Sequence, residues 1–68
     1  MKTVIEKIVK AQDRLNIAMS LIHLKETRER NGLWNEEDKN EIAKKIIDKL
    51  IEARDTMETA IIEVAGWQ

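Results

Sequence analysis

Positions 31–35 carry the sequence NGLWN, which separates two long segments with helical periodicity. Gly32 suits the left-handed backbone conformation that ends a helix, because it has no side chain to clash there. Asn35 is a residue type that caps a following helix by accepting a backbone N–H. The acidic residues at 36–38 then place negative charge at the positive end of that helix dipole. This stretch predicts one helix that ends near residue 30 and another that begins near residue 36.

Apolar residues recur at alternating steps of three and four on both sides of this loop. The first stripe consists of Met1, Val4, Ile8, Ala11, Leu15, Ala18 and Ile22. The second consists of Ala43, Ile46, Leu50, Ala53, Met57, Ala60 and Val64. Such stripes are typical of helices with one apolar face. We predict helices at about residues 2–30 and 36–65, with Gly66 as a second stop signal, within one domain over residues 1–68.

So short a loop forces the two helices to lie antiparallel. Alanine in both stripes allows the helix axes to approach closely, but two helices alone cannot bury every apolar side chain. Burying one large aliphatic side chain is worth about 1.5–3 kcal/mol, and a whole domain nets only about 5–15 kcal/mol. We therefore expect an all-α fold, an antiparallel two-helix hairpin that forms a homodimeric four-helix bundle. The expected dimer core consists of Ile5, Ile8, Leu15, Met19, Ile22, Ile46, Ile47, Leu50, Met57 and Ile61.

Composition narrows the class of protein. The 68 residues include no cysteine and one histidine, with 43% hydrophobic and 37% charged residues and a net charge of −1. This mix is too apolar for a disordered chain and too charged for a membrane span. We expect no signal peptide and a cytoplasmic location, since the missing cysteine fits a reducing compartment. His23 alone cannot make a metal site, and we find no phosphate loop or nucleophile–base arrangement. We expect no enzyme activity, no metal and no cofactor.

A second stripe on the first helix is the most informative feature for function. It consists of Lys7, Lys10, Arg14, Ile17, Leu21, Leu24 and Arg28, again at steps of three and four. Its apolar centre either widens the dimer core or forms a docking site for another protein, with the basic residues steering an acidic partner. The candidate partner-binding residues are Lys10, Arg14, Ile17, Leu21, Leu24 and Arg28. Trp34 and Trp67 lie at helix ends and either cover the ends of the bundle or anchor a partner.

The organisation resembles the repressor-of-primer family, plasmid copy-number proteins whose two-helix hairpins dimerise into four-helix bundles and bind paired RNA loops. The resemblance rests on chain length, on the position of the loop at 31–35, and on alternating small and large residues in the apolar stripes. It implies a homodimer whose first helices form an RNA-binding face. The residues that would contact RNA are Lys7, Lys10, Arg14, Lys25 and Arg28.

Three functions remain open on the sequence. The leading hypothesis is a small non-enzymatic interaction or regulatory protein that acts through the surface of a helical bundle. The second is an RNA-binding regulator of the kind that the resemblance implies. The third is a structural subunit whose helices complete a larger helical assembly, and a stable homodimer in isolation would count against it.

Overall fold

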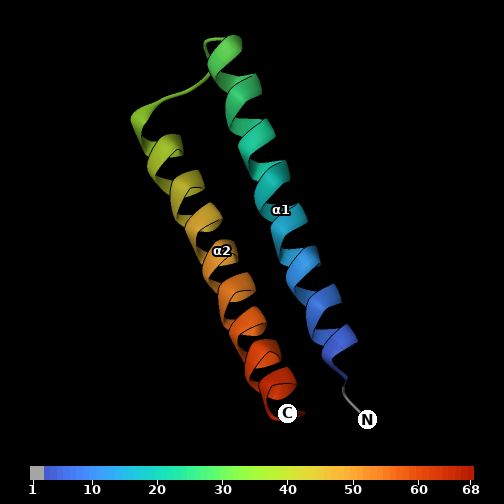
Figure 1. Ribbon diagram of the computed structural model, residues 1–68. Helices are drawn as coiled ribbons and strands as arrows, with labels where there is room; N and C mark the ends of the chain where they lie inside the picture. The colour runs from blue at the N-terminus through green and yellow to red at the C-terminus, as the bar shows by residue number, and fades with distance from the viewer. Residues whose placement is uncertain (1–2) are drawn as a thin grey trace.

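Two long helices and one loop make up the computed structural model, which describes residues 3–68. Helix α1 spans Val4–Arg30 and helix α2 spans Glu36–Ala65. They lie side by side and antiparallel in a rod with extents of 52, 17 and 15 Å, with the loop at one end (Figure 1). The predicted all-helical hairpin is confirmed. The predicted start near residue 2 and Met1 of the predicted first stripe lie outside the described residues.

Helix α1 begins with a cap that the sequence analysis missed. The backbone of Thr3 is extended, and its hydroxyl oxygen accepts a hydrogen bond from the backbone N–H of Glu6 at 3.3 Å. Threonine followed three residues later by glutamate is the sequence pattern of a helix start with a side-chain cap. The signal was present in the sequence, and it explains why α1 begins at Val4.

The loop ends α1 and starts α2 through backbone hydrogen bonds. Gly32 adopts a φ of +69°, its N–H donates to the carbonyl of Glu29, and the N–H of Leu33 donates to the carbonyl of Arg28. These two bonds satisfy carbonyls that the end of a helix otherwise leaves without partners. At the start of α2, the side-chain oxygen of Asn35 accepts from the N–H of Asp38 at 2.8 Å. The roles predicted for Gly32 and Asn35 are confirmed.

The seam between the two helices is made of alanine. Ala11 and Ala18 of α1 and Ala53 and Ala60 of α2 are each at most 4% exposed. Small side chains allow two helices to approach closely, but they bury little apolar area. The only other residue that counts as buried among the described ones is Ile42. The hairpin therefore has a thin core of its own.

Ile42, rather than the predicted Ala43, occupies the seam at the loop end of α2, and Ala43 is exposed. Ile42 lies eleven residues before Ala53, which is close to three turns of about 3.6 residues each, so both point the same way. Ala43 is one residue further along and is rotated by roughly 100°. The prediction of Ala43 was wrong because Ile42 and Ala43 are adjacent apolar residues, so either one fits the spacing of the stripe.

Candidate interaction surfaces

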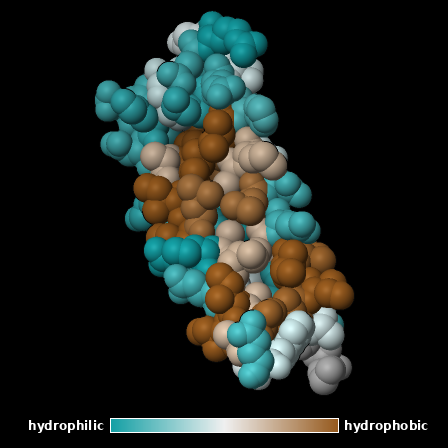
Figure 2. Space-filling model, viewed as in Figure 1, coloured by the Kyte–Doolittle hydropathy of each residue, from teal (hydrophilic) through white to brown (hydrophobic). Residues whose placement is uncertain are grey.

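One side of the hairpin is mainly apolar, and we call it the apolar face. It consists of Ile5, Ile8, Leu15, Met19 and Ile22 of α1 and of Ile47, Leu50, Met57, Ile61 and Val64 of α2. These side chains are between 36% and 70% exposed. Figure 2 shows apolar side chains of both helices gathered along one face, with hydrophilic residues beside them and at the loop end. An exposed apolar face of this extent is unusual on a monomeric protein and is typical of interaction sites.

Side chains of both helices share shallow hollows along this face. Near the chain ends, Ile8 lies in one hollow with Met57 and Ile61. Further along, Leu15 and Met19 share another hollow with Leu50. Large side chains of a second helix pair could enter these hollows, which is how helical bundles interlock.

All ten predicted dimer-core residues lie at the surface of the single hairpin. Ile46 is half-buried, and the other nine belong to the apolar face. A third hollow at the loop end brings Ile46 and Ile47 together with Ala43 and Trp34. Their role as a dimer core stays a prediction, since the structure contains one chain.

The opposite side of the hairpin, which we call the polar face, carries ion pairs that join the two helices. Lys7 Nζ lies 3.1 Å from Glu63 Oε2, and Arg14 Nε lies 2.8 Å from Glu52 Oε2. Near the loop, Arg28 Nη1 lies 3.7 Å from Asp38 Oδ2. The three cations are spaced by two and then four turns of α1, so they all lean across the seam toward α2.

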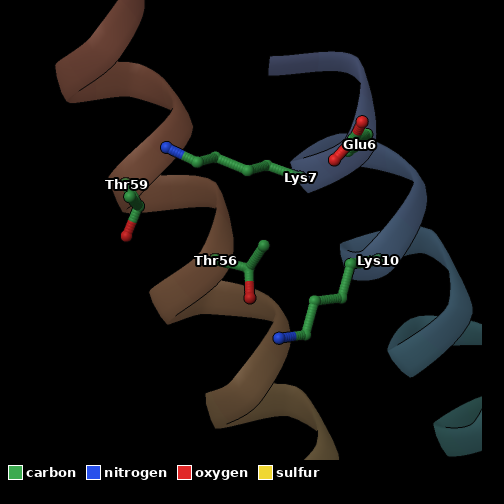
Figure 3. A pocket seen from close by; sticks show the side chains of 5 residues that line it. All are labelled: Glu6, Lys7, Lys10, Thr56 and Thr59. Carbon is green, nitrogen blue, oxygen red and sulfur yellow. The ribbon is translucent and has the colours of Figure 1, made fainter. Parts of the chain in front are cut away.

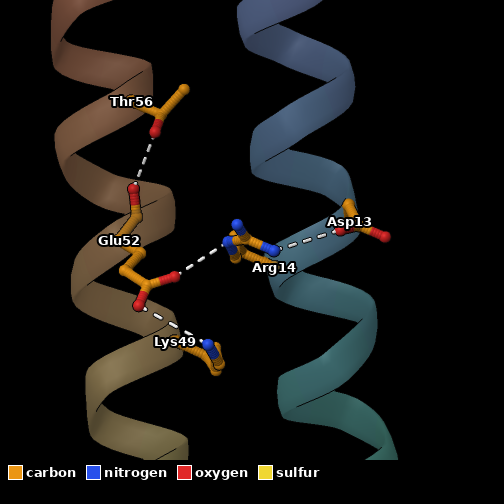
Figure 4. A network of polar contacts seen from close by, with 5 residues as sticks. All are labelled: Asp13, Arg14, Lys49, Glu52 and Thr56. Atoms are coloured by element: carbon orange, nitrogen blue, oxygen red, sulfur yellow. Dashed lines mark hydrogen bonds and ion pairs between the residues drawn. The ribbon is translucent and has the colours of Figure 1, made fainter.

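Arg14 is at the centre of this polar face (Figure 4). Its guanidinium contacts Glu52 on α2 and also Asp13, whose Oδ2 lies 3.2 Å from Nη1. The Nε–H is buried and is not aligned for a hydrogen bond to Glu52, so this contact is an ion pair only. Glu52 also lies 3.5 Å from Lys49 Nζ, and its carbonyl accepts from the hydroxyl of Thr56. The positive charge of Arg14 is thus directed at carboxylates of the same chain.

Two lysines of α1 extend toward threonines of α2 near the chain ends (Figure 3). Lys7 is engaged by Glu63, and the hydroxyls of Thr56 and Thr59 donate to backbone carbonyls one turn earlier in α2. Within residues 3–68, Lys10 has no carboxylate within ion-pair distance. The groove between these lysines and threonines therefore offers an anionic ligand one cation without an ion-pair partner among the described residues, Lys10, and no free hydroxyl donor.

Four of the five basic residues that would contact RNA are paired with carboxylates of the hairpin. Lys7, Arg14 and Arg28 pair across the seam as described. Lys25 Nζ lies 2.8 Å from Glu29 Oε1, and the hydrogen bond and charge of Glu29 raise the pKa of Lys25 above its usual value. A phosphate would have to compete with each of these carboxylates, which weakens the nucleic-acid interpretation.

The predicted partner-binding residues lie on the polar face. Leu21, Leu24 and Arg28 share one hollow at the loop end with Asp38 and Ile42 of α2. Leu21 and Ile17 are half-buried, while Leu24 is 40% exposed and Lys10 is exposed. The apolar part of this stripe is therefore on the other side of the hairpin from the apolar face and does not widen it. Its role in binding a partner stays a prediction.

The two tryptophans differ in their surroundings. Trp34 is half-buried and lines the apolar hollow with Ile46 and Ile47. Trp67 is 70% exposed and Ile62 behind it is 72% exposed, so Trp67 does not cover Ile62 in the single hairpin. Gly66 ends α2 with a right-handed φ of −68°, so its freedom to adopt a left-handed conformation is not used.

Side chains that could together hold a metal ion are sparse over residues 3–68. No three His, Asp or Glu side chains in this part of the chain come together in a way that could hold a metal ion. His23 is exposed, with Nδ1 4.0 Å from Glu26 Oε2. Neither α1 nor α2 has a stretch long and apolar enough to cross a membrane.

Gln12 and Arg54 are two positions that the sequence analysis did not single out. Gln12 lies in the same hollow as Leu15, Met19 and Leu50, so it interrupts the apolar face. Arg54 lies seven residues from both Ile47 and Ile61, which places it on the same side of α2. The signal that could have found them is a polar residue at a heptad position between apolar ones.

Comparison of the chain with protein-family models, with curated proteins and with solved structures found no match.

Proposed function

We propose that this chain is a small, non-enzymatic interaction or regulatory protein that works as a homodimer, in which the apolar faces of two hairpins pack into a four-helix bundle. The observation that carries the proposal is the contrast between the seam and the face. The seam inside the hairpin buries four alanines and Ile42, whereas the large apolar side chains on the apolar face remain 36–70% exposed.

Energetics favour covering this face. Ordering the backbone costs about 1–2 kcal/mol per residue, which a core of alanines cannot offset over two helices of this length. Each large aliphatic side chain on the face would add up to about 1.5–3 kcal/mol if fully buried. A second copy supplies an apolar face of the same length and chemistry, and symmetric homodimers are the commonest oligomers.

Dimerisation through the apolar face leaves the polar face open to a partner. The hollow formed by Leu21, Leu24 and Ile42 is bordered by Arg28, Asp38 and Glu41, so it combines a small apolar centre with charges of both signs. Such a surface fits an apolar side chain of a protein partner better than a nucleic-acid backbone, which needs clustered positive charge. The missing cysteine fits a reducing compartment, and a cytoplasmic location is part of the proposal.

Sedimentation equilibrium on matched variants tests the dimer. Leu15→Glu places a charge in the apolar face, and we expect it to abolish the dimer and to lower the helix content at micromolar concentration. Ile62→Glu is the control, because Ile62 is 72% exposed and lies outside the face. A wild-type chain that sediments as a fully helical monomer would refute the dimer and with it the proposed function.

Two further measurements separate the alternatives for the polar face. Leu24→Glu should leave the dimer and its helix content unchanged, because Leu24 lies away from the apolar face. A gel shift with structured RNA at low salt should show no complex, since four of the five relevant cations are paired in the hairpin. A salt-dependent shift that Lys10→Ala weakens would instead support the RNA-binding regulator.

A further inference from the structure

We infer that the two hairpins of the dimer lie with their loops at the same end of the bundle, so that α1 of each chain packs against α2 of the other. The inference rests on the proposed dimer and specifies its geometry. It follows from the heights of residues along the rod and from the charges at the edge of the apolar face.

Two of the three ion pairs that join the helices agree on which residues of α1 and α2 lie at the same height, whereas the long side chain of Lys7 reaches Glu63 about one turn further along α2. Arg14 lies opposite Glu52, and Arg28 lies opposite Asp38. Because the helices run antiparallel, a step toward the chain start on α1 matches a step toward the chain end on α2. Gln12 is two residues before Arg14, and Arg54 is two residues after Glu52, so Gln12 and Arg54 share a height.

Heptad steps from this pair define the edge of each helix that would meet a partner. From the chain ends toward the loop, the edge of α1 carries Ile5, Gln12, Met19 and Glu26. At the same heights, the edge of α2 carries Ile61, Arg54, Ile47 and Asn40. Both edges thus read apolar, polar, apolar, polar in the same direction along the rod.

With the loops at the same end, the two-fold axis runs along the rod and the edge of α1 meets the partner's α2. Each residue on the edge of α1 then meets the residue of the partner's α2 that lies at the same height along the rod, so apolar residues meet apolar residues. Gln12 comes beside the partner's Arg54, and its side-chain oxygen can accept a hydrogen bond from that guanidinium. Both hairpins also overlap over their full length, which buries the most apolar area.

Loops at opposite ends would produce a poorer match, because α1 would then meet the partner's α1, and α2 the partner's α2. The alignment that pairs Ile5 with the partner's Met19 sets Arg54 against the partner's Arg54, which brings like charges together. It also leaves both loop ends overhanging, so the hollow at Trp34 stays uncovered. Sliding the hairpins to full overlap instead sets Gln12 beside the partner's Ile22.

Charges at the loop end agree with the same geometry. Arg30 lies eighteen residues after Gln12, and Glu36 lies eighteen before Arg54, which corresponds to five turns of about 3.6 residues. Arg30 therefore lies on the same edge of α1 as Gln12, and Glu36 lies on the same edge of α2 as Arg54. Arg30 and Glu36 also share a height along the rod. Within residues 3–68, neither has an ion-pair partner in the hairpin. Loops at the same end bring Arg30 beside the partner's Glu36 at both symmetric positions.

Electron–electron distances between spin labels test the arrangement directly, because the chain has no cysteine of its own. The label is attached at Asn31→Cys in the exposed loop, with Gln68→Cys as a matched label at the other end of the rod. With helix axes about 8–10 Å apart, loops at the same end predict a single label-to-label distance below about 35 Å for either variant.

Each outcome has a separate meaning. A distance of about 50 Å between the Asn31→Cys labels, as expected from a rise of 1.5 Å per residue along the rod, would leave the dimer intact and overturn the inference. Absence of any dipolar coupling, together with a monomer in sedimentation, would refute the dimer itself. Should Asn31→Cys fail to fold, Gln68→Cys gives the same test, with a separation of about 40 Å or more contradicting the inference.

Discussion

Replacing Leu15 by alanine distinguishes a face that is buried in a dimer from one that is open to water. In the hairpin alone Leu15 is 42% exposed, so alanine would forfeit only part of its burial. A fully buried Leu→Ala change costs about 2–5 kcal/mol, and roughly half of that, about 1–2.5 kcal/mol per chain, applies to the single hairpin. In the dimer the side chain becomes buried in both copies, so the cost per dimer rises to about 4–10 kcal/mol.

The assay is urea unfolding followed by circular dichroism at two protein concentrations. A loss of 4 kcal/mol corresponds to a nearly thousandfold weaker dissociation constant, since 1.4 kcal/mol is about tenfold. Ile62→Ala serves as the control, because Ile62 is 72% exposed and lies off the apolar face. A buried apolar face would be contradicted if Leu15→Ala lowered the free energy of unfolding by less than about 2 kcal/mol per chain and the unfolding midpoint did not depend on protein concentration.

Other substitutions test the loop and the proposed geometry. Gly32→Ala should cost about 1–2 kcal/mol per chain in urea unfolding because φ is +69°, although no atom lies within 4 Å of the added carbon. Asn35→Ala should cost about 0.5–2 kcal/mol through loss of the cap on α2, and Asn35→Asp should restore most of it. Arg30→Glu should weaken the dimer several-fold in sedimentation, and adding Glu36→Arg should recover it. No recovery in that double variant would argue against loops at the same end.

Local sequence signals were sufficient to predict the hairpin. The positive φ of Gly32 and the cap at Asn35 follow from the chemistry of those two residues, and both are present. The heptad spacing of Ala11, Ala18, Ala53 and Ala60 predicted which residues could sit between closely spaced helices. These features depend on a few neighbouring residues or on one period, so the sequence alone can reveal them.

Rotation of α2 about its axis was harder to predict. Ile42 and Ala43 are adjacent apolar residues, as are Ile46 and Ile47, so either of two neighbouring stripes fits the period. The ion pairs of the polar face agree with the observed rotation, because Arg14 reaches Glu52 when α2 turns its acidic side toward α1. Long, flexible side chains have no fixed spacing signal, so this pairing could not be read from periodicity.

The same ion pairs explain why the second stripe of α1 was ambiguous. Its charges resemble a basic docking or RNA-binding strip in the sequence, where residues 1–31 hold seven Lys or Arg against four acidic residues. In the fold, Arg14 and Arg28 face the acidic residues of α2, and the apolar Leu21 and Leu24 are left between charges of both signs. Exposed ion pairs are individually weak, about 0–1 kcal/mol, so they orient the helices more than they stabilise them.

Whether folding and association occur together is the central question, and the concentration dependence of thermal unfolding tests it most directly. We expect sedimentation to give about twice the chain mass of 7.9 kDa at micromolar concentration, with a melting temperature that rises as the protein concentration is raised. A fully helical 7.9 kDa species whose melting temperature is the same across a hundredfold dilution would contradict the account.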